Sequence, residues 1–220
     1  MHIHTSNQEE LELGFGGYTC NWGLHICGLY ETENERDEIL FGFLHQGAVV
    51  RDKQLYCPVE WSKEGFIKEY ARRYPEDARH TQDPDLFTIS SAKEFYYPDG
   101  TFSPLAMDKR HVDYYEESQK NGRRNVRGTA EMAWAVEAIH GVENLMLYES
   151  RLNYFIPGKP WISICLYNTT KFSGSIIMKV LQTHPYTISG GTITQNPYYR
   201  DPDIWLRENA PEFLNNQERV

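Results

Sequence analysis

The chain has 220 residues, of which 40% are hydrophobic and 14% aromatic, enough for one sizeable core, so we expect one domain. Its formal net charge is -9, and Lys and Arg are scattered apart from the stretch NGRRNVR (121–127). The sequence therefore predicts no basic face for a nucleic-acid backbone and no direct binding of nucleic acid. The absence of a long apolar run and of a signal-peptide pattern favours a soluble, cytoplasmic protein that does not bind a membrane.

The first half of the chain alternates between strand-like and helix-like segments. In the stretch after HICGLY, apolar residues recur at helical spacing, while Ser62 and Pro75 predict the start and the end of a second helix. The predicted elements are strands at 25–30, 54–59 and 86–91, helices near 35–52 and 63–74, and a short strand extension and turn at 94–102.

The second half repeats this alternation. WISICLY (161–167) is the most strand-like run of the chain, and Pro185 ends the helix that follows it. The predicted elements are helices at 111–121, 129–139, 143–155 and 173–184, a short strand at 124–128, and edge structure at 186–193 and 196–199. Such alternation predicts an α/β fold with three layers, in which helices flank a mostly parallel sheet.

The first loop after a strand differs from a phosphate-binding loop. YETENERDE (30–38) has no glycine and no lysine, whereas a Walker-type loop needs both to wrap and neutralise phosphates. ATP binding in the usual mode is therefore not expected. Its acidic residues are also explained by the preference of carboxylates for the first turn of a helix. Ligands of open α/β sheets bind beyond the carboxyl ends of the strands, which directs attention to the loops at 30–37, 60–61, 127–131 and 167–173.

The four cysteines fit reduced thiols, because no CxxC pair or dense disulfide framework is present. His25 and Cys27 share one face of their strand, so a metal site is possible if Cys57 or Cys165 lies on a neighbouring strand. The ordinary alternative is burial, since free cysteine is among the most buried residue types.

Five segments together resemble the MEDS domain, the sensory domain of methanogens and methylotrophs that also occurs in the regulator DcmR. They follow the order of that family and span residues 25–199: HICGLYETENERDEILFGFLHQG, RGTAEMAWAV, LYESRLN, CLYNTTKFSGSIIMKVLQTHP and GGTITQNPYY. The family is similar to P-loop ATPases of the KaiC and RecA type whose phosphate loop has been lost. The resemblance therefore implies a KaiC-like or RecA-like fold with a degenerate P-loop.

The resemblance also implies a function in prokaryotic signal transduction. Members of the family are thought to sense simple hydrocarbon derivatives and are usually fused to histidine kinase, PAS or helix-turn-helix modules. With the domain at 25–199, an extension at 1–24 and a tail at 200–220 are too short for such a module. We therefore expect the output to pass through a partner, such as a histidine kinase or a regulator, through a homo-oligomer, or through sequestration of the ligand.

The matching segments supply ten candidate ligand-binding residues, and no catalytic residue is expected. The candidates are His25, Tyr30, Glu31, Arg127, Glu131, Trp134, Tyr167, Asn168, Ser173 and His184. Most have a structural alternative: an ion pair between Arg127 and Glu131, a helix cap at Ser173, or a core position for His25. On the predicted helix 129–139, Glu131 and Trp134 would share one face.

Three functions remain open from the sequence. The first is a non-catalytic sensor that binds a one-carbon compound or simple hydrocarbon derivative at the carboxyl edge of the sheet, with no cofactor. The second is a metal, haem or corrinoid protein that uses Cys and His ligands, which are His25, Cys27, Cys57 and Cys165 as the metal set, or His184. The third is a residual RecA-type ATPase with Glu131 as its catalytic carboxylate.

Overall fold

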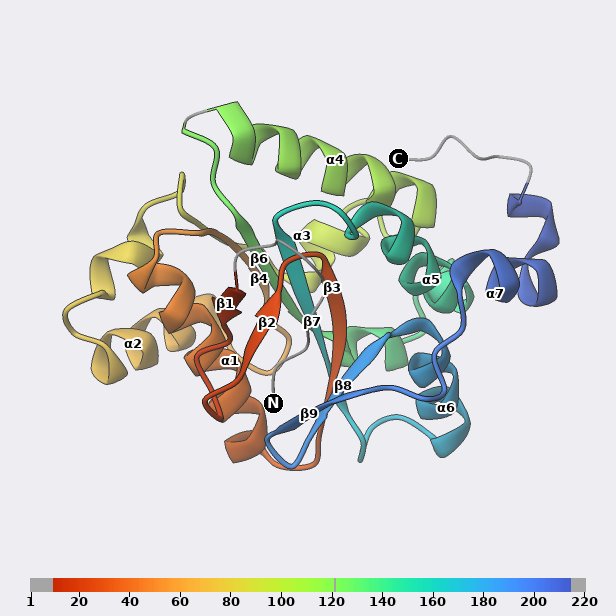
Figure 1. Cartoon of the computed structure of the whole chain (residues 1–220), viewed down its shortest axis with the longest axis horizontal. Coiled ribbons are helices and arrows are strands. Elements are labelled where there is room, and N and C mark those ends of the chain that lie inside the picture. Colours follow the sequence, from red (N-terminus) through yellow and green to blue (C-terminus); the bar gives the residue numbers. More distant parts are fainter. Residues whose placement is uncertain (1–9, 121, 215–220) are drawn as a thin grey trace.

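The computed structural model describes residues 10–120 and 122–214 and contains a seven-stranded sheet of order β5-β4-β6-β7-β3-β8-β9. All neighbouring strands are parallel except β8 and β9, which form an antiparallel hairpin at one edge (Figure 1). The strands are β3 (Leu24–Tyr30), β4 (Lys53–Cys57), β5 (Phe87–Ile89), β6 (Val126–Glu131), β7 (Trp161–Asn168), β8 (Tyr186–Ser189) and β9 (Thr192–Gln195). The predicted α/β fold with a mostly parallel sheet is thus confirmed.

Helices cover both faces of the sheet. They are α1 (Glu33–Val49), α2 (Lys63–Arg73), α3 (Ala92–Tyr96), α4 (Pro104–Lys120), α5 (Leu145–Phe155), α6 (Gly174–Thr183) and α7 (Pro202–Asn209). The residues of α1 and α2 belong to one apolar cluster, and those of α3 to α7 belong to a second cluster. Successive strand residues divide between the two: Ile164 and Leu166 pack in the first, while Cys165 and Tyr167 pack in the second. The sheet is therefore the middle of three layers.

Residues outside the expected domain also take part in the fold. A two-stranded sheet of β1 (Glu10–Glu12) and β2 (Thr19–Asn21) precedes β3, and α7 packs against α5. The parts of the predicted extension and tail at 1–9 and 215–220 lie outside the described residues, as does Asn121 at the end of a predicted helix. In the described parts of the chain, no helix is long and apolar enough to cross a membrane.

Two predicted elements are wrong. Residues 129–131 belong to β6, and 132–136 form a 3-10 helix in place of the predicted helix 129–139. β6 lies between β4 and β7, and all six of its residues are buried, so tertiary burial outweighs the helix propensity of Ala130 and Glu131. Residues 92–96, expected in part as a strand extension, form α3, because Ser91 and Glu94 make a capping box.

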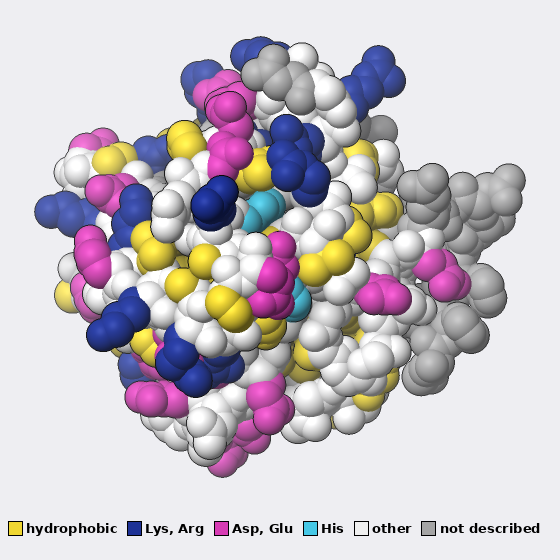
Figure 2. All heavy atoms as spheres, turned by 90° about the vertical axis from the view of Figure 1, so that its left-hand side faces the viewer, with side chains coloured by type: hydrophobic (Ala, Val, Ile, Leu, Met, Phe, Trp, Pro, Cys, Tyr) yellow, Lys and Arg dark blue, Asp and Glu magenta, His cyan; other side chains and the backbone are white. Residues whose placement is uncertain are grey.

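Several local predictions are confirmed. The side chains of Ser62 and Ser173 accept hydrogen bonds from backbone N–H groups at the starts of α2 and α6. Within the stretch 186–193 that was expected as edge structure, Gly190 and Gly191 join β8 to β9 with positive φ at both residues, which is the conformation of a two-residue hairpin turn. On the face that carries α2, acidic and basic side chains are interspersed (Figure 2).

Candidate functional site

The junction of β3 and α1 is closed by its own side chains. Thr32 caps α1, and the carboxylate of Glu35 accepts hydrogen bonds from the backbone N–H groups of Glu31 (2.8 Å) and Thr32 (3.1 Å). These hydrogen bonds hold the pKa of Glu35 below its ordinary value. Backbone N–H groups at the start of a helix are the groups that bind phosphate in nucleotide-binding folds. Here a carboxylate of the chain already uses them.

A chain of ion pairs connects three loops at the carboxyl edge of the sheet. The guanidinium of Arg36 donates to Asp37 and to Glu60 Oε2, the latter at 2.5 Å. Glu60 Oε1 accepts from Lys171 Nζ at 2.6 Å and from Asn168 Nδ2 at 3.3 Å. The loops after β3, β4 and β7 are thereby joined through the single carboxylate of Glu60.

Glu131 ends β6 and anchors the loop after β4. One carboxylate oxygen accepts from the hydroxyl of Tyr56 at 2.5 Å, and the other accepts from the backbone N–H groups of Val59 (2.9 Å) and Glu60. Burial raises the pKa of Glu131, and these hydrogen bonds act in the opposite direction. Both oxygens are thus occupied by groups of the chain.

The structure brings only some of the predicted residues to this edge. Tyr30 and Asn168 are paired in the register of β3 and β7, and both lie near Glu60 and Glu131. Glu31 is exposed at the same end of β3. The side chain of Ser173 caps α6.

Arg127 and Trp134 lie elsewhere. Arg127 is in the amino-terminal half of β6, where its Nε donates to Asp52 at 2.7 Å, so the ion pair with Glu131 considered from the sequence does not form. Trp134 stacks on Tyr96 with ring centroids 4.6 Å apart, on the 3-10 helix rather than on a helix face shared with Glu131.

Three other predicted residues meet in the interior, on the side of the sheet that carries α5. His25 Nε2 and His184 Nε2 lie 3.2 Å and 3.4 Å from Glu149 Oε2, and the Tyr167 hydroxyl donates to Glu149 Oε1 at 2.6 Å. Cys165 Sγ lies 3.5 Å from His25 Nε2 and 3.7 Å from Glu149 Oε2. The predicted metal ligands are therefore only partly assembled: His25, Cys165 and His184 meet, Glu149 joins them, and Cys27 and Cys57 lie outside the cluster.

Glu149 was missed because an acidic residue on a helix ordinarily faces solvent. Its side chain is instead fully buried, and the segments that contribute its partners are far away along the chain. Burial is the main cause that lowers the pKa of His25 to about 4, and His184 acts in the same direction.

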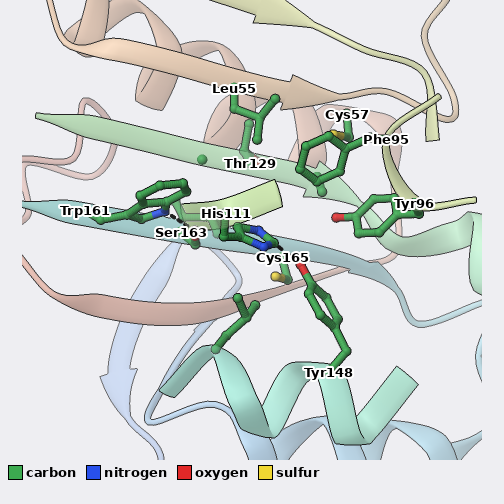
Figure 3. A pocket seen from close by; sticks show the side chains of 14 residues that line it. Leu55, Cys57, Phe95, Tyr96, His111, Thr129, Tyr148, Trp161, Ser163 and Cys165 are labelled. Atoms are coloured by element: carbon green, nitrogen blue, oxygen red, sulfur yellow. Dashed lines mark hydrogen bonds between the residues drawn. The ribbon is translucent and has the colours of Figure 1, made fainter. Parts of the chain in front are cut away.

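A small cavity of about 20 Å³ lies beside this cluster, between the sheet and helices α3, α4 and α5. Its wall combines aromatic rings with aliphatic and polar side chains (Figure 3). The rings are those of Phe95, Tyr96, His111, Tyr148 and Trp161, and the polar side chains include Thr129, Ser163 and Cys165. The Tyr148 hydroxyl and His111 Nε2 are 3.5 Å apart. A volume of this size holds about one water molecule.

Comparison with protein families identifies the chain. Residues 24–185, more than half of the chain, match the family described as MEDS, "MEthanogen/methylotroph, DcmR Sensory domain". The chain belongs to the MEDS family. The extent of this match confirms the resemblance seen in the ordered sequence segments. No curated protein matches the chain.

Solved structures show the fold of this MEDS chain. A KaiC-like protein, PH0186 from Pyrococcus horikoshii OT3, has a TM-score of 0.54 at 11% identity, covering 82% of this chain and 80% of its own. The flagellar accessory protein FlaH from Methanocaldococcus jannaschii has a TM-score of 0.50 at 13% identity, covering 89% of this chain and 92% of its own. At such identities the likeness shows a KaiC-like, RecA-like architecture and no activity.

Proposed function

We propose that this MEDS chain is a non-catalytic sensor that binds a small molecule without a phosphate group at the carboxyl edge of its sheet and signals through a partner protein. The expected ligand class is a one-carbon compound or a simple hydrocarbon derivative. The observation that carries the proposal is the self-capped junction of β3 and α1, where side chains of Glu35 and Thr32 occupy three backbone N–H groups at the place where related folds bind phosphate.

The ion pairs at this edge supply a means of response. A ligand that enters between the loops after β3, β4 and β7 competes with Lys171 and Asn168 for Glu60. Loss of either contact changes how the loop at 168–173 is held. A partner that binds the two loop arrangements with different affinities would convert ligand binding into a signal.

The aromatic cavity is a second location for the same ligand class. Aromatic walls with few polar groups suit a small, weakly polar molecule. At about 20 Å³ the cavity must expand to admit anything larger than water, so binding there would displace the side chains of α3 or α5.

A titration followed by amide NMR tests the proposal. Methanol, methylamine and dichloromethane are added separately to the isotope-labelled chain, and ATP with Mg²⁺ is added in a parallel series. We expect shifts at Glu60 and Thr169 with at least one carbon compound and none at residues 31–35 with ATP. Shifts confined to Gly128 and Cys165 would place the ligand in the cavity, while saturable binding of ATP at 31–35, or no response to any compound, would contradict the proposal.

Variants sharpen this test. Lys171→Met removes one competing ion pair, so ligand should bind about two- to fivefold more tightly, the range expected for a surface salt bridge. Asn168→Ala removes the second competing contact at Glu60 and should also tighten binding, by about two- to tenfold. Lys93→Met on α3, where the side chain is exposed, is the matched control and should leave the affinity unchanged.

ATP hydrolysis is the competing activity. Turnover of ATP that disappears in Glu131→Gln would favour a residual RecA-type ATPase over the sensor. The contacts of Glu131 argue for an anchoring role, since both of its oxygens are used by Tyr56 and the loop after β4. We therefore expect Glu131→Gln to lower stability without any change in ATP turnover.

A further inference from the structure

Four potential metal ligands from four separate segments converge in the interior. They are His25 on β3, Glu149 on α5, Cys165 on β7 and His184 directly after α6, and one ligand atom of each lies within 4.8 Å of the others. All four residues are buried, with at most 4% of the surface of any one of them exposed. The cluster lies within the helical layer of α5 and is independent of the proposed sensor site at the carboxyl edge.

The protonation of His184 is fixed by its surroundings. Its Nδ1 lies 2.8 Å from the carbonyl oxygen of Val180, and a carbonyl oxygen can only accept a hydrogen bond. Nδ1 therefore carries a proton, and in the tautomer with one proton the lone pair lies on Nε2. That atom is fully buried, has no hydrogen-bond partner, and faces the carboxylate of Glu149 at 3.4 Å.

The same reasoning applies to His25. Asn153 Nδ2 donates to the backbone carbonyl oxygens of Glu149, Ser150 and Thr183, which fixes the orientation of its amide. Its Oδ1 therefore accepts the hydrogen bond from His25 Nδ1 at 3.3 Å. The Nε2 of the neutral His25 ring is thus also bare, and it points at the same carboxylate oxygen from 3.2 Å.

Lone pairs directed at one point require a cation to hold them together. The two neutral imidazoles and the carboxylate have no proton between them, and the only hydrogen available is that of the Cys165 thiol. The alternative is one imidazolium, which pairs a single histidine with the carboxylate and leaves the other Nε2 lone pair buried against the same oxygen, with the two rings 4.0 Å apart. A divalent cation satisfies all of the donors at once.

The distances fit a tetrahedral zinc site. With bonds of about 2.0–2.1 Å to nitrogen and oxygen and about 2.3 Å to sulfur, tetrahedral edges are about 3.3 Å between nitrogen and oxygen and about 3.5 Å to sulfur. The corresponding separations here are 3.2 and 3.4 Å from nitrogen to oxygen, 3.5 Å from sulfur to nitrogen, and 3.7 Å from sulfur to oxygen. Four of the six separations between ligand atoms therefore fit the ion, and the other two lie within 4.8 Å.

The surroundings also match a metal centre. Metal-binding histidines usually donate their other ring N–H to an oxygen, as His25 and His184 do here, and ligating carboxylates are held by further hydrogen bonds, as Tyr167 holds Glu149. A carboxylate and a thiolate carry two negative charges, which a divalent ion neutralises in a site closed to water. Sulfur and imidazole ligands favour zinc over calcium or magnesium.

We propose that His25, Glu149, Cys165 and His184 form a closed, four-coordinate structural site for Zn²⁺. The ion would join β3, β7, α5 and the segment after α6. Because the site is buried, the ion is bound as the chain folds and is removed only when the chain unfolds. This inference goes beyond the proposed sensor function and does not depend on it.

Elemental analysis of the untagged full chain is the first test. We expect about one zinc ion per chain, and a loss of about tenfold or more in zinc content in Cys165→Ser, Glu149→Gln and His184→Gln. Cys57→Ser is the matched control, because Cys57 is equally buried on the same face of the sheet but lies outside the cluster, and it should keep its zinc. Folded protein without metal, retention of zinc in Cys165→Ser, or iron or copper in place of zinc would overturn the proposal.

A second measurement, cobalt substitution, tests the metal site even if the variants fail to fold. The wild-type chain is denatured, stripped with a chelator and refolded with Co²⁺. Strong visible absorption of tetrahedral cobalt with a thiolate charge-transfer band is expected, and the same spectrum is expected for Cys57→Ser. The weak spectrum of six-coordinate cobalt without that band, or complete refolding in chelator with no change in melting temperature, would overturn the proposal.

Discussion

His111 shows how burial alone sets the behaviour of a single residue. Its ring lies in the aromatic cluster between α4 and the sheet, with Nδ1 2.7 Å from the carbonyl oxygen of Met107. Burial is the main cause that lowers its pKa to about 4; His25 and Arg110 act in the same direction, and Glu149 and the Met107 carbonyl oppose them. The ring is therefore neutral in the folded chain at neutral pH.

This shift predicts a loss of stability in acid. The unfolded chain takes up a proton at His111 near the ordinary histidine pKa of 6.5, whereas the folded chain does so only near about 4. Between these values the free energy of unfolding should fall by about 1.4 kcal/mol per pH unit through this residue. Urea unfolding from pH 7 to 4 should show a shallower dependence in His111→Phe. The exposed His140→Phe is the control, and an equal slope in all three proteins would refute the assignment.

At the scale of elements, α1 is positioned by a close approach of two glycines. The segment after β1 crosses the helix so that Gly14, at φ +86°, lies against Gly42 of α1. A Cβ built on either residue would lie well inside van der Waals contact with the backbone of the other. At Gly42, close packing therefore favours glycine, whereas helix propensity favours a residue with a side chain.

We expect packing to decide at this position. Gly42→Ala gains about 1 kcal/mol in helix propensity. The new methyl group would clash with backbone atoms, which cannot move aside as a flexible side chain can, so the free energy of unfolding should fall by about 1–3 kcal/mol in total. Gly174→Ala, at the start of α6 with no atom within 4 Å of the new Cβ, should be neutral or slightly stabilising. Thermal unfolding of both variants measures this, and stabilisation by Gly42→Ala would disprove the close approach.

At the scale of the whole molecule, the core extends beyond the family match. The match ends at residue 185, yet Trp205 and Leu206 on α7 are buried in the same cluster as Tyr148 and Val180. α7 contacts both α5 and α6. The segment at 202–209 is therefore part of the fold and supports the helix that carries Glu149.

Removal of the Trp205 side chain should be costly. We expect Trp205→Ala to lower the free energy of unfolding by about 3–5 kcal/mol, as for other buried aromatic residues. Its neighbour Ile204 is 45% exposed, so Ile204→Ala should change stability by less than about 1 kcal/mol. Denaturant unfolding compares the two, and similar effects would mean that α7 is not docked.

Elements of this fold were predictable where local patterns and burial agree. Ser62 and Ser173 cap the helices expected from the sequence, and the apolar run WISICLY forms a central strand. The prediction failed at TAEMAWAV, where residues 129–131 lie in a strand between two others and residues 132–136 form a 3-10 helix. Position in the sheet is set by contacts distant in sequence, which local propensity does not contain.

The candidate sites were less predictable for a related reason. The sequence suggested His25, Cys165 and His184 separately, because each lies at a strand or at a helix end. Their common partner Glu149 resembles a surface residue of a helix, and only the packing of α5 against β3 and β7 makes it central. A buried carboxylate is defined by the partners that surround it, and these come from several separate segments rather than from one.

Cys165 belongs both to the four-residue cluster and to the wall of the aromatic cavity. A molecule that enters the cavity contacts the sulfur of Cys165 directly. Any displacement of the sulfur changes its distances to His25 Nε2 and Glu149 Oε2. Such coupling is reciprocal: whatever tightens the cluster changes the affinity of the cavity by the same factor. The four-residue cluster and the cavity are therefore linked thermodynamically through one shared atom, the sulfur of Cys165.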